Sequence, residues 1–148
     1  MEKLTKVAEL TVSYKPIQGN LPLVKSSFDA YTVLKDFFPE EQIGMQEMFV
    51  VMYLNNAGKV IGVYRLSVGG ITGTVADPRL ILGTALKVAA TTIIVAHNHP
   101  SGNLSASQSD IDLTRKLKEA GKFLEIQLLD HLIIAGQKYY SFADEGLL

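Results

Sequence analysis

Residues 91–110 read TTIIVAHNHPSGNLSASQSD, and the predicted fold is built outward from this stretch. Its first six residues form an uncharged, β-rich run with helical patterns on both sides, as expected for an interior strand covered on both faces. Pro100 and Gly102 then predict a loop, and Ser107 is well placed to begin a helix. The stretch therefore predicts a buried strand ending at His97, followed by a polar loop and a helix.

Two histidines, His97 and His99, lie two residues apart where the apolar run ends. Because side chains at positions i and i+2 of a strand point the same way, both imidazoles are expected to reach one ion. Asp110, at the start of the next helical pattern, would supply an oxygen ligand. Three protein ligands with an open fourth position are typical of catalytic zinc. In the alternative interpretation, the histidines are polar loop residues beside a Pro-Gly turn.

The spacing of Ser107 and Asp110 has two interpretations. Ser-x-x-Asp is close to a capping box, which stabilises the first turn of a helix without any metal. The same aspartate is also placed to face an ion, and the pattern alone does not choose between the two roles. They are compatible, because a helix can begin after Ser107 while Asp110 faces the ion from its first turn.

Hydrolysis at a metal also needs a group that takes a proton from water and returns it to the leaving group. A carboxylate in a partly apolar environment suits that task. Glu47 stands at the beginning of the apolar run 46–54 and is the best candidate by position and surroundings. Its alternative is an ordinary carboxylate in solvent at the end of a strand.

The remaining pattern predicts one α/β domain with helices packed on a mixed sheet. Residues 4–14 alternate weakly and predict an N-terminal strand, whereas the glycine loop 69–74 lacks both P-loop and Rossmann spacing, which disfavours phosphate binding. The other predicted elements are a helix before Pro39, a β-hairpin of residues 46–54 and 59–68, a helix capped by Asp77, a helix from Ser107 stopped by Gly121, a strand within 123–134 and an edge strand within 137–142.

Length and composition restrict the function classes. A chain of 148 residues is long enough for one core, and a net charge of −1 provides no electrostatic footprint for nucleic acid. The absence of cysteine excludes disulfides and thiolate metal sites, and it disfavours zinc deaminases, whose sites need Cys ligands. With neither a secretory h-region nor an apolar run of membrane-spanning length, a cytoplasmic protein without a membrane partner is expected.

Together, Glu47, the His97-x-His99-Pro100 sequence and Ser107-x-x-Asp110 resemble the JAMM motif of the JAB/MPN metalloprotease superfamily. The chain resembles the RadC family more narrowly. That resemblance is carried by residues 97–102, by the Asp110-x-x-x-Thr114-x-x-Leu117 helix, and by residues 129–134 followed by 139–142. It covers about residues 25–148 as a RadC-like JAB/MPN domain and leaves residues 1–24 as an N-terminal extension.

The resemblance implies a cytidine-deaminase-like α/β/α sandwich, with a mixed β-sheet flanked by helices, that binds one zinc ion. It implies His97, His99 and Asp110 as ligands, Glu47 as general acid/base, and Ser107 as a hydrogen-bond donor to the oxyanion of the tetrahedral intermediate. The expected reaction is hydrolysis of a peptide or isopeptide bond in an unidentified peptide or protein substrate.

A second function remains open at this point. RadC proteins take their name from DNA repair, so the alternative is an accessory protein of DNA metabolism with a non-catalytic metal site, although the net charge does not support nucleic-acid binding. Asp130-His131 is a RadC-like feature outside the JAMM motif. It is expected either to contact a metal ligand or substrate, or to hold the sheet together.

Overall fold

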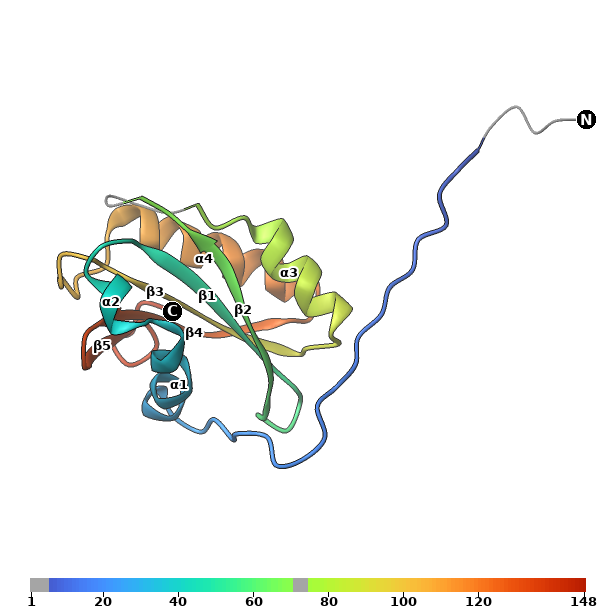
Figure 1. Cartoon of the computed structure of the whole chain (residues 1–148), viewed down its shortest axis with the longest axis horizontal. Helices are drawn as coiled ribbons and strands as arrows, with labels where there is room; N and C mark the ends of the chain where they lie inside the picture. The colour runs from blue at the N-terminus through green and yellow to red at the C-terminus, as the bar shows by residue number, and fades with distance from the viewer. Residues whose placement is uncertain (1–5, 71–74) are drawn as a thin grey trace, which may run out of the picture.

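A computed structural model describes residues 6–70 and 75–148, and its centre is one mixed sheet in the order β2-β1-β3-β4-β5 (Figure 1). Only β3 and β4 are parallel, and every other neighbouring pair is antiparallel. The strands are β1 (Met48–Leu54), β2 (Val60–Val68), β3 (Thr92–Asn98), β4 (Gln127–Ala135) and β5 (Lys138–Ser141). The helices are α1 (Ser27–Leu34), the 3-10 turn η1 (Lys35–Phe37), α2 (Glu40–Ile43), α3 (Pro78–Lys87) and α4 (Gln108–Phe123).

The sheet is covered on both faces, which explains why β1 and residues 93–96 of β3 are apolar. Along β1, Met48, Val50 and Met52 pack on the side of α1, while Phe49 and Val51 pack on the side of α3 and α4. All seven residues of β1 are buried, as expected for a strand with helices above and below it. The predicted α/β sandwich with a mixed sheet flanked by helices is therefore confirmed (Figure 1).

Local sequence signals account for most element boundaries. The hairpin turns where the Asn55 side chain accepts hydrogen bonds from the N–H groups of Ala57 and Lys59. Helix α3 begins after Asp77, whose carboxylate accepts from the Arg79 N–H at 2.8 Å, with Pro78 at the first helical position.

Gly121 does not stop helix α4, which corrects the sequence-based expectation. The helix continues to Phe123, and β4 begins only at Gln127. The Ile126 N–H returns to donate to the Gly121 carbonyl oxygen at 2.8 Å, and a Cβ on Gly121 would lie 2.5 Å from the Ile126 carbonyl oxygen. The glycine therefore permits a close approach of two backbone segments.

The N-terminal expectation is also corrected. Residues 6–14 form no strand; they are exposed and lie outside the sheet (Figure 1). Backbone hydrogen bonds tie the following segment to the hairpin, where the Val60 N–H donates to the Pro22 carbonyl and the Val24 N–H to the Gly58 carbonyl. Within the predicted glycine loop 69–74, residues 71–74 lie outside the described residues. Among the helices of the described ranges, none combines the length and apolar character needed to cross a membrane.

Candidate metal centre

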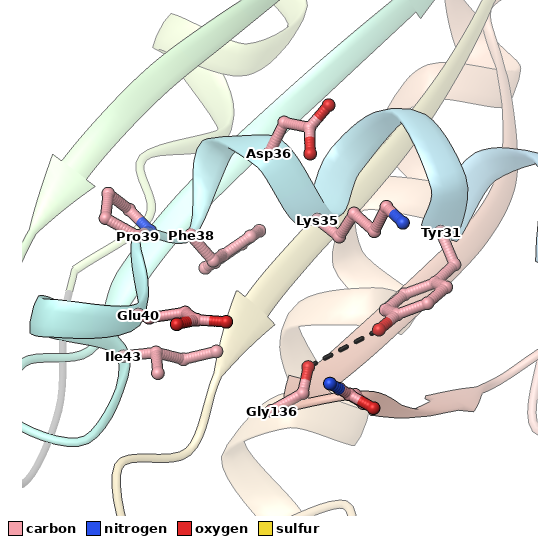
Figure 2. Close-up of a pocket in the computed structure, with 9 residues that line it drawn as sticks. Tyr31, Lys35, Asp36, Phe38, Pro39, Glu40, Ile43 and Gly136 are labelled. Atoms are coloured by element: carbon pink, nitrogen blue, oxygen red, sulfur yellow. Dashed lines mark hydrogen bonds between the residues drawn. The ribbon is translucent and has the colours of Figure 1, made fainter.

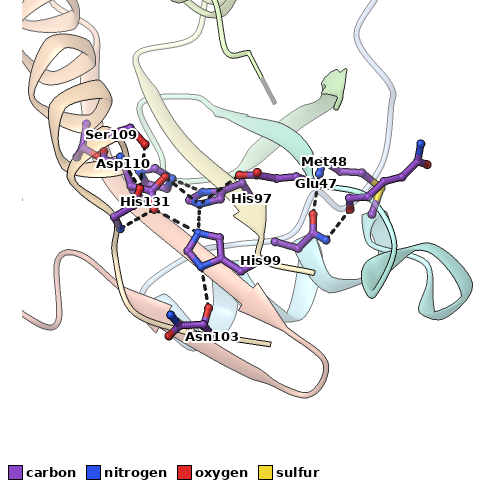
Figure 3. A network of polar contacts seen from close by, with 12 residues as sticks. Glu47, Met48, His97, His99, Asn103, Ser109, Asp110 and His131 are labelled. Atoms are coloured by element: carbon purple, nitrogen blue, oxygen red, sulfur yellow. Dashed lines mark hydrogen bonds and ion pairs between the residues drawn. The ribbon is translucent and has the colours of Figure 1, made fainter. Parts of the chain in front are cut away.

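The end of β3 delivers two imidazoles to one point. His97 is the penultimate residue of β3, pairs with Phe49 of β1 and Ile133 of β4, and is 1% exposed. His99 follows directly after the strand, and its Nε2 atom lies 2.9 Å from Nε2 of His97 (Figure 3). Two imidazole nitrogens at that separation need a proton or a cation between them, since two lone pairs would repel each other.

Asp110 caps helix α4 and also faces both histidines. Its carboxylate accepts from the Ser107 N–H at 2.9 Å, and its own N–H donates to Ser107 Oγ at 3.1 Å, which completes a capping box. The same carboxylate places Oδ1 3.2 Å from His97 Nε2 and Oδ2 3.2 Å from His99 Nε2. The first turn of α4 therefore brings one carboxylate against both imidazoles.

Glu47 reaches the cluster from the segment just before β1. Its backbone pairs with Gly69 and Gly70, which continues the hairpin ladder beyond β2. Its Oε1 atom lies 3.9 Å from His97 Nε2, and one ligand atom each from Glu47, His97 and His99 lie within 4.8 Å of one another. The Glu47 side chain is 14% exposed, and burial raises the pKa of its carboxyl above the ordinary value. The interpretation of Glu47 as a fully solvated carboxylate is therefore wrong.

Asn98 fixes the segment that carries Glu47. The side chain is fully buried and uses its amide group on three backbone partners. Its Nδ2 donates to the carbonyl oxygens of Ile43 and Gln46, each at 2.8 Å, and its Oδ1 accepts from the Met48 N–H at 2.7 Å. These partners lie on both sides of Glu47 in the sequence. Asn98 thus ties the α2–β1 connection to β3, between the two histidines.

The third histidine belongs to the same cluster, and sequence reasoning left its role open. His131 on β4 is fully buried, with its Nε2 2.8 Å from His97 Nδ1 and its Nδ1 2.7 Å from Thr114 Oγ1. Thr114 was singled out only as part of a family pattern. The parallel pairing of β3 and β4 could have pointed to His131, because it sets this residue opposite Val95, which lies two residues before His97 on the same strand.

The neighbouring Asp130 has a different task. Its carboxylate accepts from the N–H groups of His131 and Ala143 and from the Ser141 hydroxyl, at 2.7, 3.0 and 2.6 Å. Although these hydrogen bonds favour the charged form, burial dominates and raises the pKa of Asp130. Asp130 holds β4 to the segment after β5, whereas His131 contacts the candidate ligand.

Ser107 stands at the N-cap of α4. Its hydroxyl oxygen accepts from the Asp110 N–H and lies 2.9 Å from Ser109 Oγ. Because a hydroxyl has one proton and two lone pairs, accepting from Asp110 leaves the Ser107 proton available to another acceptor. Capping and hydrogen-bond donation are therefore compatible in this side chain.

The charges of the cluster favour a bound cation. Burial alone would raise the pKa of Asp110, but hydrogen bonds from His97 and His99 hold it well below its usual range. The hydrogen bond with Asp110 in turn raises the pKa of His99, against the opposing effect of burial. The Asp110 carboxylate thus favours protonation of His99, and a cation bound between the same groups would compete with that proton.

The donor atoms fit a divalent transition-metal ion. His99 Nδ1 lies 2.7 Å from the Asn103 carbonyl oxygen, which can only accept, so this nitrogen carries the proton (Figure 3). In the neutral imidazole, Nε2 then presents its lone pair toward His97 and Asp110. Neutral imidazole nitrogen and carboxylate oxygen are ligands that zinc accepts readily.

A cavity lies elsewhere in the fold. It has a volume of about 670 Å³ and is bounded by α1, η1, α2 and the turn between β4 and β5, where the Tyr31 hydroxyl donates to the Gly136 carbonyl at 3.4 Å (Figure 2). The residues that line this cavity do not include Glu47, His97, His99 or Asp110. The candidate site is therefore assigned from its converging donor atoms and not from cavity size.

Comparison with known proteins places this geometry in context. A family described as RadC-like JAB domain matches residues 24–147. A UPF0758 protein of Flavobacterium johnsoniae is 47% identical over 86% of the chain, and one of Porphyromonas gingivalis is 40% identical over 98%. A third, of Syntrophomonas wolfei, is 36% identical over the whole chain. The chain spans 54%, 64% and 65% of the lengths of these three relatives.

Proposed function

Because the chain belongs to the RadC-like JAB domain family, we propose that it is a zinc-dependent hydrolase of peptide or isopeptide bonds, a metalloprotease of the JAMM type. The observation that carries this proposal is the convergence of His97 Nε2, His99 Nε2 and both Asp110 carboxylate oxygens, with the Glu47 carboxylate beside them.

In this proposal His97, His99 and Asp110 hold one zinc ion, and Glu47 remains free to carry protons. Distances support this division of roles, because Asp110 oxygens lie 3.2 Å from each Nε2 atom whereas Glu47 Oε1 lies 3.9 Å from His97 Nε2. When bound, zinc would act as a Lewis acid toward a carbonyl oxygen and lower the pKa of a water to about 7.

Glu47 takes a proton from the attacking water as the water oxygen bonds to the carbonyl carbon. It then returns this proton to the nitrogen that leaves when the C–N bond breaks. Its raised pKa supports this role, since general acid/base groups work best when their pKa approaches the operating pH. The Ser107 hydroxyl donates a hydrogen bond to the oxyanion of the tetrahedral intermediate, a contribution of about 3 kcal/mol in comparable sites.

The test uses zinc-loaded protein with quenched-fluorescence peptide libraries containing either backbone amide bonds or Lys-linked isopeptide bonds. Glu47→Gln should retain zinc and lose about 100-fold or more of the hydrolysis rate, because it removes only the proton carrier. Glu41→Gln, at an exposed position of α2, is the matched control and should match the parent.

Equal hydrolysis by the parent and Glu47→Gln, or no cleavage of either library by zinc-loaded parent, would overturn the proposal. A non-catalytic accessory role in DNA metabolism predicts a different outcome. Glu47→Gln would then be silent in every assay, while binding to duplex DNA would weaken steeply with added salt through counterion release.

A further inference from the structure

His131 lies directly behind His97, on the side away from the proposed zinc ion. Both side chains are buried, and the His131 ring is further held by stacking on Phe142, with the ring centroids 4.6 Å apart. His131 Nε2 lies 2.8 Å from His97 Nδ1 (Figure 3). On the other side of the ring, His131 Nδ1 lies 2.7 Å from Thr114 Oγ1. A chain of three side chains therefore leads from helix α4 through β4 to β3.

The available protons decide which atom donates and which accepts along the series Thr114, His131 and His97. The Thr114 hydroxyl donates its single proton to the Asp110 carbonyl oxygen at 2.6 Å. Thr114 Oγ1 must then accept from His131, so the proton of His131 sits on Nδ1. A neutral His131 consequently presents the lone pair of Nε2 to His97, and His97 must donate from Nδ1. The remaining lone pair of His97, on Nε2, then points at His99 and Asp110.

We propose that Thr114 and His131 are positioning residues that set the tautomer of His97, so that its Nε2 lone pair faces the metal before any metal arrives. This inference rests on the metal centre within the proposed function but not on hydrolysis. Neither residue touches the ion; each acts through His97. The arrangement also fixes the orientation of the His97 ring, because its Nδ1 is held in the contact with His131 Nε2.

The chain offers a matched pair of variants at Thr114, which is 2% exposed within α4. Thr114→Val removes the hydroxyl and keeps the shape, so His131 no longer has an acceptor for its Nδ1 proton. The His131 proton can move to Nε2, which forces His97 to protonate its metal-facing nitrogen. Thr114→Ser retains the hydroxyl and should preserve the parental arrangement.

The first measurement is zinc affinity by competition with a chromophoric chelator. Thr114→Val should bind zinc about 10- to 100-fold more weakly than the parent, whereas Thr114→Ser should stay within about threefold. His131→Phe, which keeps a ring against Phe142, should lose affinity by a similar factor. Equal zinc affinities in a folded Thr114→Val variant and the parent would overturn the inference.

The second measurement reads the tautomers directly in metal-free protein. The chain contains only three histidines, so ¹⁵N-labelled imidazoles can be assigned individually by NMR. In the metal-free parent and in Thr114→Ser, His131 should carry its proton on Nδ1 and His97 should have a proton on Nδ1. In Thr114→Val the His97 proton should shift to Nε2. Protonation of His131 at Nε2 in the parent would refute the inference, whatever the stability of the variants.

These results separate the inference from the proposed hydrolase. Zinc affinities and tautomers that follow the Thr114 variants, together with no peptide cleavage, would support the positioning roles and overturn hydrolysis. Peptide cleavage that depends on Glu47, together with unchanged zinc affinity in Thr114→Val, would do the reverse.

Discussion

Replacing Asn98 should damage both the stability of the fold and the placement of Glu47. Asn98→Ala removes three hydrogen bonds and leaves the Met48 N–H, which is buried, without its side-chain partner. A buried group left unpaired costs about 2 kcal/mol, and the two carbonyl partners are only partly buried and should cost about 1 kcal/mol each. We therefore expect a loss of about 4 kcal/mol in the free energy of unfolding.

Equilibrium denaturation in urea measures this loss, and Asn56→Ala, in the exposed hairpin turn, is the control. Asn98→Asp should be at least as destabilising near pH 7, since it keeps the acceptor for Met48 but turns a carboxylate oxygen toward the carbonyls of Ile43 and Gln46. A loss below about 1 kcal/mol for Asn98→Ala would refute the reasoning that these backbone groups depend on the side chain.

Two further predictions concern α4 and the pH dependence of the site. Gly121→Ala should lower Tm despite the better helix propensity of alanine, because the new Cβ meets the Ile126 carbonyl oxygen. Gly83→Ala in α3 is the control, since its Cβ would enter open space, and it should stabilise the fold by about 1 kcal/mol. Equal effects of the two substitutions in calorimetry would contradict the packing argument. Because the pKa of His99 is raised, a proton competes with the metal, so zinc affinity should fall as the pH drops below that raised pKa and change little above it. Zinc titrations across this pH range should show the fall in the parent, and an affinity independent of pH would rule out this competition.

Two predictions from the sequence were wrong because tertiary contacts, and not the local pattern, decide the structure at those positions. The weak alternation of residues 4–14 resembles a strand, but described residues 6–14 have no partner strand in the sheet, and a strand needs backbone partners. Gly121 resembles a helix stop, yet its position reflects the approach of the Ile126 backbone, which no local pattern can indicate. The alternation of residues 4–14 and the glycine at position 121 are both real features of the sequence, but neither has the structural consequence predicted from it.

Local patterns were enough to predict most of the elements and the local part of the candidate site. Period-two and helical patterns specify which segments pair and pack, the i,i+2 spacing aligns His97 with His99, and Ser107-x-x-Asp110 encodes a capped helix start. The contacts that bring these parts together depend on the tertiary fold. Strand pairing brings Glu47 and His131 to the end of β3, and helix packing brings Thr114 onto His131. Such contacts depend on which strands become neighbours, and that choice follows from burying both faces of one sheet rather than from any local spacing.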